Sequence, residues 1–199
     1  MIIDAHVHAE AGAHDLHPGV LWAADQLGVC RLCVSSLGNW RYVPSTQECI
    51  EANKQTRTIM AKRPDRVWGY CYLNPAALPI RRNGREHGWK EEMDRCLEGG
   101  MIGVKLWVAV RCTEACARQV VERAIEKGVP VLVHAWWKET GNLPHESRPE
   151  DVAQLSRLYP QAKLIMAHLG GDWQRGYAAI RDTTAYADTC GSIVERGMI

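Results

Sequence analysis

Short apolar runs alternate with amphipathic stretches along the whole chain, and this alternation restricts the fold more than any other feature of the sequence. The apolar runs predict strands at residues 1–6, 29–35, 66–73, 101–107, 129–134, 162–168 and 186–190. The stretches between them predict helices at residues 19–28, 45–63, 84–99, 113–127, 148–158 and 172–183. Strands that alternate with helices in this way are expected to run parallel and to be joined by right-handed crossovers.

Two architectures accommodate this pattern, a doubly wound open sheet and a β/α barrel. No G-x-G-x-x-G follows the first predicted strand, and no G-x-x-x-x-G-K-[ST] occurs in the chain, which disfavours a nucleotide-binding open sheet. The helix boundaries are well marked. Ser45 and Glu48 have the spacing of a capping box, while Gly28, Gly99 and Gly128 follow the ends of predicted helices.

Polar residues at the ends of the predicted strands favour the barrel. His6 and His8 end the first strand, Lys105 lies in the fourth, His134 ends the fifth and His168 ends the sixth. The two histidines of the H-x-H pair are two residues apart on an extended chain, so their rings point to the same side. The carboxyl ends of barrel strands meet on one face, which carries the active site. The histidines and the lysine are therefore expected to share one site.

Several imidazoles on an otherwise apolar frame are the usual ligands of zinc or a similar divalent ion. A metal held in this way lowers the pKa of a bound water to about 7 and polarises a carbonyl group. The sequence therefore predicts hydrolysis, or another reaction that needs a Lewis acid. Lys105 has two interpretations, a role in the site or a simple ion pair with a carboxylate.

The eight cysteines are not expected to carry the chemistry. Cys30 and Cys33 form a C-x-x-C, which suggests zinc binding or redox activity. They lie in a predicted strand, where this spacing places the two side chains on opposite faces. Cys112 and Cys116 have helical spacing, but no other ligand lies near them in the sequence. All four are interpreted as packing residues in a reduced protein.

Aromatic residues gather near the predicted strand ends, which suggests a broad apolar pocket for an aromatic, cyclic or hydrophobic substrate. The tryptophans concerned are Trp40, Trp107, Trp136, Trp137 and Trp173. Burial of some of them beneath loops is the alternative, because tryptophan is highly buried wherever it occurs. Arg148, at the end of a polar loop over residues 138–149, is a candidate to bind a substrate carboxylate.

Charge and length limit the class of protein. The 199 residues include 24 Lys and Arg against 23 Asp and Glu, which gives no electrostatic basis for binding nucleic acid or a membrane surface. No apolar run reaches the roughly 18 residues of a membrane span, and the first residues lack the layout of a signal peptide. We expect one soluble, cytoplasmic domain over residues 1–199 that acts on a small molecule.

Several segments together resemble the amidohydrolase superfamily of metal-dependent hydrolases. They are IIDAHVH, GVKLW, PVLVHAWW, LIMAHLGG and YADTCGS, in this order along the chain. The closest group is amidohydrolase 2, which also contains aminocarboxymuconate-semialdehyde decarboxylase. The resemblance covers essentially the whole chain and implies a distorted TIM-type (β/α)8 barrel, an α/β fold.

The resemblance also implies roles for the strand-end residues. His6, His8 and His134 are similar to metal ligands, and His168 to a residue that binds a second metal or acts as a base. Lys105 lies where some members carry a carbamylated lysine that bridges two metals. Other members bind one metal without that lysine. One ion, zinc first among divalent metals, is therefore favoured, and two are an open option.

The chain departs from the superfamily pattern at its end. Members carry an aspartate on the eighth strand as metal ligand and general base, but here the seventh strand ends near Asp188 and the sequence stops at Ile199. Asp172 and Asp188 are the candidate substitutes, and Asp172 could equally cap a helix. The chain is expected to lack the eighth β/α unit and to be the first seven-eighths of a longer protein.

Three functions fit these observations. The leading hypothesis is a divalent-metal hydrolase of an amide, ester or lactone bond. The second is a non-oxidative decarboxylase or hydratase on the same metal site. The third is an incomplete barrel that binds metal or a partner without catalysis. An open barrel edge would favour a homo-oligomer.

Overall fold

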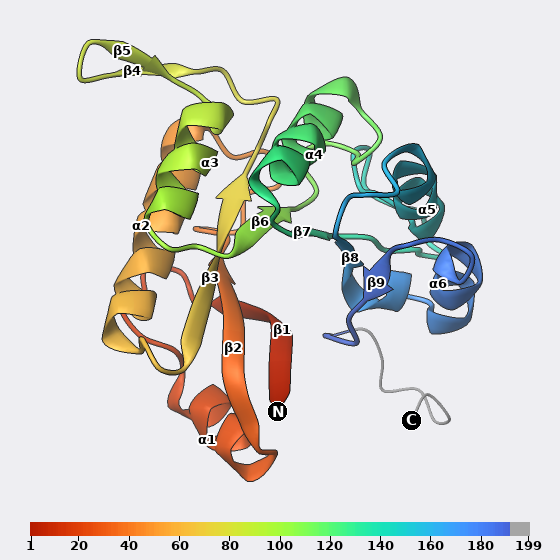
Figure 1. Cartoon of the computed structure of the whole chain (residues 1–199), viewed down its shortest axis with the longest axis horizontal. Helices are drawn as coiled ribbons and strands as arrows, with labels where there is room; N and C mark the ends of the chain where they lie inside the picture. The colour runs from red at the N-terminus through yellow and green to blue at the C-terminus, as the bar shows by residue number, and fades with distance from the viewer. Residues whose placement is uncertain (192–199) are drawn as a thin grey trace. The chain divides into compact units, whose positions relative to one another are not determined.

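The computed structural model describes residues 1–191 and divides into two compact units, Met1–Gly103 and a second that begins at Val104 (Figure 1). Residues 192–199 lie outside the described residues. Each unit alternates strands with helices, as the sequence predicts. None of the described helices is long and apolar enough to cross a membrane.

The first unit is built on three parallel strands in the order β1, β2, β3, which span Ile2–Ala9, Val29–Ser36 and Val67–Leu73. Its helices are α1 (Pro18–Gln26), α2 (Thr46–Lys62) and α3 (Trp89–Glu98). Helices α2 and α3 pack on β3 and on each other (Figure 1). Leu32, Val34 and Ile59 are almost completely buried in the resulting core.

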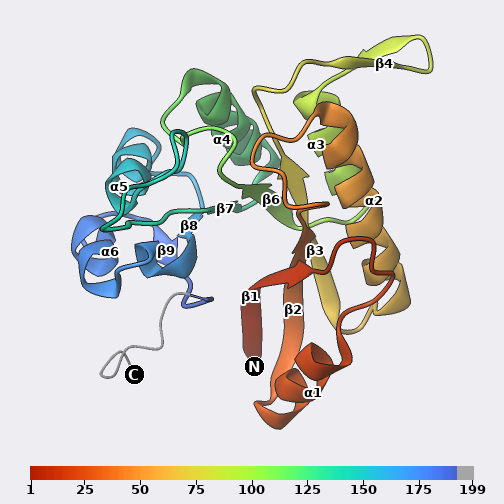
Figure 2. The same ribbon diagram turned by 180° about the vertical axis from the view of Figure 1, so that it is seen from behind.

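The second unit continues the alternation with four parallel strands in the order β6, β7, β8, β9. They span Gly103–Leu106, Val131–Val133, Leu164–Met166 and Tyr186–Ala187. Its helices are α4 (Ala115–Lys127), α5 (Pro149–Leu158) and α6 (Trp173–Ile180), and the short 3-10 turn η1 spans Ala167–Gly170. Helix α5 packs on α6 and on β8 (Figure 2).

Strand β7 is covered on both faces, which explains why its apolar residues do not alternate with polar ones. Val131, Leu132 and Val133 are successive residues of β7, and each is 1% exposed or less. Consecutive side chains of a strand point to opposite faces, so a strand without a polar face must be covered on both. Over residues 1–191, the seven strands and the helices between them form an α/β TIM-like fold without a full barrel.

The expected helix over residues 84–99 is wrong in its first part. Helix α3 begins at Trp89, and the preceding residues form an antiparallel hairpin of β4 (Ile80–Arg82) and β5 (Arg85–His87). Asn83 and Gly84 make the turn, both with positive φ, at 51° and 77°. Asn-Gly is the strongest short-range signal for such a turn. The residues after this turn pair as β5, so the helix cannot begin at residue 84 and begins at Trp89 instead.

The predicted capping box of α2 is confirmed, and it makes a testable contribution to stability. The Ser45 hydroxyl accepts from the Glu48 amide at 3.3 Å, and Glu48 Oε2 accepts from the Ser45 amide at 2.7 Å. Ser45→Ala removes the first bond, so it should lower the free energy of unfolding by about 1 kcal/mol in urea denaturation. Ser45→Thr keeps the hydroxyl and serves as control. An alanine variant as stable as the threonine variant would refute the prediction.

Candidate metal centre

The first unit brings His6 and His8 together on β1. Their Nε2 atoms lie 3.0 Å apart and the rings meet edge to face, with centroids 4.7 Å apart. The pairing register of β1 with β2 shifts between Asp4 and Val7, and Asp4 Oδ1 accepts from the His6 amide at 3.0 Å. Bulges of this kind redirect side chains and are frequent beside active sites. His6 itself is 1% exposed.

A hydrogen bond to β2 fixes the tautomer of His8. Its Nδ1 lies 3.1 Å from the Ser35 carbonyl oxygen and 3.1 Å from the Ser35 hydroxyl. Because a carbonyl oxygen only accepts, Nδ1 carries the proton. The lone pair of His8 is therefore on Nε2, the atom that faces His6.

The second unit brings His134 and His168 together. His134 directly follows β7, and His168 lies in the turn η1 after β8 with a φ of 63°. His134 Nδ1 and His168 Nε2 are 3.2 Å apart. Residues with side chains rarely adopt positive φ, and such conformations cluster at functional sites. The predicted strand end at His168 is thus a strained turn.

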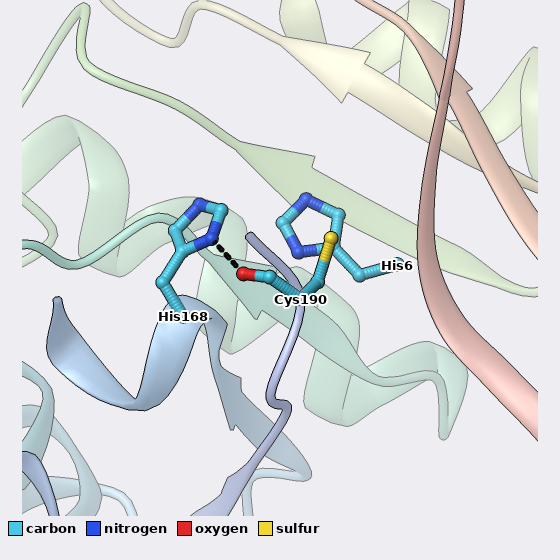
Figure 3. Close-up of side chains that lie close together, drawn as sticks. All are labelled: His6, His168 and Cys190. Atoms are coloured by element: carbon cyan, nitrogen blue, oxygen red, sulfur yellow. Dashed lines mark hydrogen bonds between the residues drawn. The ribbon is translucent and has the colours of Figure 1, made fainter. Parts of the chain in front are cut away.

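Hydrogen bonds also fix the tautomers of this second pair. His168 Nδ1 donates to the Cys190 carbonyl oxygen at 2.5 Å (Figure 3). His134 Nε2 donates to Glu146 Oε1 at 2.9 Å. The two nitrogens that face each other therefore both carry lone pairs. Hydrogen bonds that orient ligand histidines in this way are a regular feature of protein metal sites.

Two facing lone pairs at this separation repel each other unless a cation lies between or beside them. Burial, together with the nearby His134 and Lys105, lowers the pKa of His168 to about 4. Burial also lowers the pKa of His134, so both rings are uncharged at neutral pH. Two nitrogens bound to one zinc ion at about 2.0–2.1 Å lie roughly 3.3–3.4 Å apart at the tetrahedral angle and roughly 2.8–3.0 Å apart at 90°. The two histidine pairs, at 3.0 Å and 3.2 Å, fall within the span of these geometries, so the donor set fits a divalent ion.

Lys105 lies on β6 and is completely buried. Burial lowers its pKa to about 7, against the opposing effect of negative charge at Asp188 and Cys190. A substantial fraction of the amine is therefore uncharged at neutral pH. The positive charge of Lys105 is one of the causes that lower the pKa of His134 and the pKa of His168. Carbamylation of this amine stays a prediction.

The two candidate substitutes for the eighth-strand aspartate have other roles in the described residues. Asp172 caps α6, because its Oδ1 accepts from the Arg175 amide at 3.0 Å. Asp188 follows β9, and its Oδ1 accepts from the His168 amide at 2.9 Å and the Cys190 amide at 3.0 Å. Asp188 therefore shapes the backbone that presents His168.

Two of the predicted pocket tryptophans lie beside histidines of their own unit. Trp40 packs edge to face against His8 at 5.2 Å, and Trp136 lies 4.8 Å from His168 between ring centroids. Trp137 instead lies under the Arg175 guanidinium, 5.0 Å from its ring centroid.

The other predicted pocket residues differ in their exposure. Trp107 and Trp173 are half-buried, and Arg148 is exposed at the N-terminus of α5. The complete pocket, with Arg148 as its anion-binding residue, stays a prediction.

The four cysteines interpreted as packing residues are free thiols. Cys33 is buried, which raises the pKa of its thiol to about 11. The Cys30 thiol donates to the Ile2 carbonyl at 2.9 Å. Burial raises the pKa of Cys112 to about 12. Thiols with raised pKa values are poor nucleophiles and poor metal ligands at neutral pH.

The sequence does not show that Glu146, in the polar loop over residues 138–149, is buried and bonded to His134; the residue is 1% exposed. It lies in the long polar loop after β7, where no periodicity distinguishes a buried carboxylate from exposed ones. Its partners, Lys138 and Asn142, are also polar loop residues. A buried carboxylate needs such partners, but the sequence does not show which loop residues meet.

A model of the amidohydrolase family matches residues 3–196 of the chain. The chain belongs to the amidohydrolase family. No curated protein matches the sequence.

Solved structures similar to this amidohydrolase come from several enzymes. It matches 4-oxalomesaconate hydratase from Rhodopseudomonas palustris with a TM-score of 0.60 and 15% identity, over 96% of this chain and 74% of that one. A probable 2-pyrone-4,6-dicarboxylic acid hydrolase from Acinetobacter baumannii gives 0.58 and 13%, over 96% and 70%. A dihydroxybenzoic acid decarboxylase from Polaromonas, with bound manganese, gives 0.54 and 18%, over 78% and 55%.

These similarities, at identities below 20%, establish a shared fold. The amidohydrolase chain spans between 55% and 57% of the length of the dihydroxybenzoate decarboxylases it matches. The fold assignment thus agrees with the TIM-like alternation of strands and helices in residues 1–191.

Proposed function

We propose that this amidohydrolase is an enzyme that uses one divalent metal ion to hydrolyse an amide, ester or lactone bond in a small substrate. His6, His8 and His134 would hold the ion, with zinc as the first candidate because it favours imidazole nitrogen. The observation that carries the proposal is the pair of facing imidazole nitrogens within each unit, at 3.0 Å and 3.2 Å. The choice of ligands also draws on membership of the family.

The bound metal would supply a polarised substrate carbonyl and a water of lowered pKa. The Cys190 carbonyl holds the proton of His168 on Nδ1, which leaves Nε2 as an acceptor. In the one-metal form, we assign His168 as the base that takes a proton at Nε2. Burial lowers the pKa of His168 to about 4, so the ring is uncharged at neutral pH. With a second metal, the same nitrogen would be a ligand instead.

Substrate binding would use the aromatic and cationic groups near the histidines. Trp136 presents an apolar face 4.8 Å from the His168 ring, which suits an aromatic or cyclic substrate. Lys105 in its charged form would stabilise negative charge that develops on a substrate oxygen. Arg148 would bind a substrate carboxylate.

Decarboxylation is the second candidate. The similar structures include decarboxylases and a hydratase as well as a hydrolase.

A substrate screen distinguishes the two reactions. The full-length protein would be stripped of metal, reloaded with Zn²⁺ or Mn²⁺, and given aromatic and cyclic lactones, esters and amides beside hydroxybenzoates. Acid release from the first group supports hydrolysis. CO2 release from the second group without acid release overturns it in favour of decarboxylation. Activity that does not depend on added metal would overturn both.

A further inference from the structure

We infer that Glu146 is a positioning residue, which fixes the tautomer and the ring orientation of His134 so that Nδ1 is presented as a metal ligand. The inference rests on the proposed function for its purpose, but all the contacts that carry it lie within the second unit. It assigns a role to a loop residue outside the predicted ligand set.

Both oxygens of Glu146 are fully used. Oε1 accepts from His134 Nε2 at 2.9 Å and from Lys138 Nζ at 2.9 Å. Oε2 accepts from Lys138 Nζ at 2.8 Å, from Asn142 Nδ2 at 3.1 Å and from the Leu143 amide at 3.1 Å. The side chain is 2% exposed. A carboxylate held by four different groups cannot turn away from His134 without breaking several bonds.

The loop that carries Glu146 is anchored at its base. The Trp136 amide donates to the Ser147 carbonyl at 2.9 Å, and the Asn142 side chain donates to the Trp136 carbonyl. These bonds close the loop over residues 136–147 on itself directly after β7. The position of Glu146 is thus tied to the same strand end that positions His134.

This carboxylate decides which nitrogen of His134 is available. An ionised carboxylate only accepts, so His134 Nε2 must carry the proton and Nδ1 the lone pair. The other tautomer would place the Nε2 lone pair against a negative charge. Nδ1 is therefore left facing His168 Nε2 at 3.2 Å. The negative charge of Glu146 also makes His134 Nδ1 more basic and therefore a stronger metal ligand. The positive charge of Lys138 balances the charge of Glu146.

The other partners of Glu146 are all hydrogen-bond donors. The Lys138 ammonium, the Asn142 side-chain amide and the Leu143 backbone amide each donate to its oxygens, so the carboxylate acts as an acceptor.

The test compares Zn²⁺ affinity, measured by competition with a chelating dye, in wild type and three variants of the full-length protein. Glu146→Ala removes the acceptor and should weaken Zn²⁺ binding by about 10- to 100-fold, as loss of such a partner typically does. Glu146→Gln keeps an acceptor oxygen without its charge and should lie between alanine and wild type. Val152→Ala is the control, because it removes buried volume from α5 of the same unit.

A second readout needs no metal. In metal-free wild type labelled with [15N]histidine, the His134 Nε2 proton should appear as a protected NMR resonance and Nδ1 should be unprotonated. Glu146→Ala should remove the protection, and Val152→Ala should not. A wild-type His134 protonated at Nδ1, or an alanine variant with unchanged protection and affinity, would overturn the inference. Equal weakening by Val152→Ala would overturn it too.

Failure of the proposed function gives a different result. If His134→Ala keeps wild-type Zn²⁺ affinity, His134 is not a ligand and the proposed metal site is wrong. If His134→Ala loses the metal while Glu146→Ala retains it at full affinity, the site stands and the positioning role falls.

Discussion

Metal binding should be lost when His6 and His8 are replaced together by alanine. The double substitution removes two of the three proposed ligands, whose Nε2 atoms face each other at 3.0 Å. Zinc sites with four ligands contribute about 10–16 kcal/mol, or roughly 2.5–4 kcal/mol for each ligand. Loss of two should therefore weaken binding by at least about 1,000-fold. Metal per chain after dialysis, measured by mass spectrometry of the elements, is the readout.

The matched control for this experiment is the double variant Cys30→Ala with Cys33→Ala. These cysteines lie on β2, the strand that pairs with β1, and form the other candidate zinc motif of the sequence. Their substitution should leave the metal content unchanged. If the cysteine variant loses metal and the histidine variant keeps it, the site lies at the C-x-x-C and the present assignment fails.

The sequence predicted the strands and their order because strands such as β3, β6 and β7 are buried on both faces, which produces continuous apolar runs. It also predicted the histidines at their ends. His168 could be placed at the end of a strand but not in its turn, because the positive φ of residues 168 and 169 depends on the backbone around them. Local sequence gives no signal for such a strained turn, which is held by Asp188.

The groups that orient the histidines could not be predicted for a different reason. His8 and His168 each donate to a backbone carbonyl, of Ser35 and of Cys190. Every residue has a carbonyl, so residue types do not show which one a ring will meet. Glu146 has a distinctive side chain, but its position depends on how a loop closes. The histidines could therefore be predicted from the sequence, but the orientation of their rings could not.

The largest expected effect on stability concerns Glu92 of α3, which is completely buried. It accepts from Asn53 Nδ2 at 3.0 Å, from His87 Nε2 at 3.0 Å and from Arg95 Nε at 2.9 Å, and Arg95 Nη2 adds a second bond at 2.5 Å. Asn53 also bonds to both the amide and the carbonyl of Tyr72. This cluster therefore joins α2, α3 and the hairpin to β3.

Glu92→Leu should lower the free energy of unfolding by about 3 kcal/mol, measured by urea denaturation of the full-length protein. Removing one partner of a buried ion pair typically costs 3–5 kcal/mol, because the other partners lose their bonds while staying buried. The lower end applies because the Arg95 side chain is 27% exposed. Glu92→Gln keeps an acceptor oxygen and should cost about 1–3 kcal/mol.

Lowering the pH should reduce the difference in free energy of unfolding between wild type and Glu92→Gln. Burial raises the pKa of Glu92, but bonds from Arg95, Asn53 and His87 outweigh burial and hold the pKa below its usual 4.5. A carboxyl with a depressed pKa stabilises the folded state above the unfolded-state pKa and loses that contribution as the pH falls towards the folded-state value. The advantage of wild type over Glu92→Gln should therefore be constant above about pH 5 and shrink below 4.5.

A double-mutant cycle with Arg95→Met shows where the energy of Glu92 arises. If the loss in Glu92→Leu comes from an arginine left without its carboxylate, then Arg95→Met added to Glu92→Leu should cost less than Arg95→Met alone. Additive effects would mean that the ion pair contributes little and that the bonds to Asn53 dominate. A Glu92→Leu variant as stable as wild type would contradict both, since a fully bonded buried carboxylate would then have been replaced without loss.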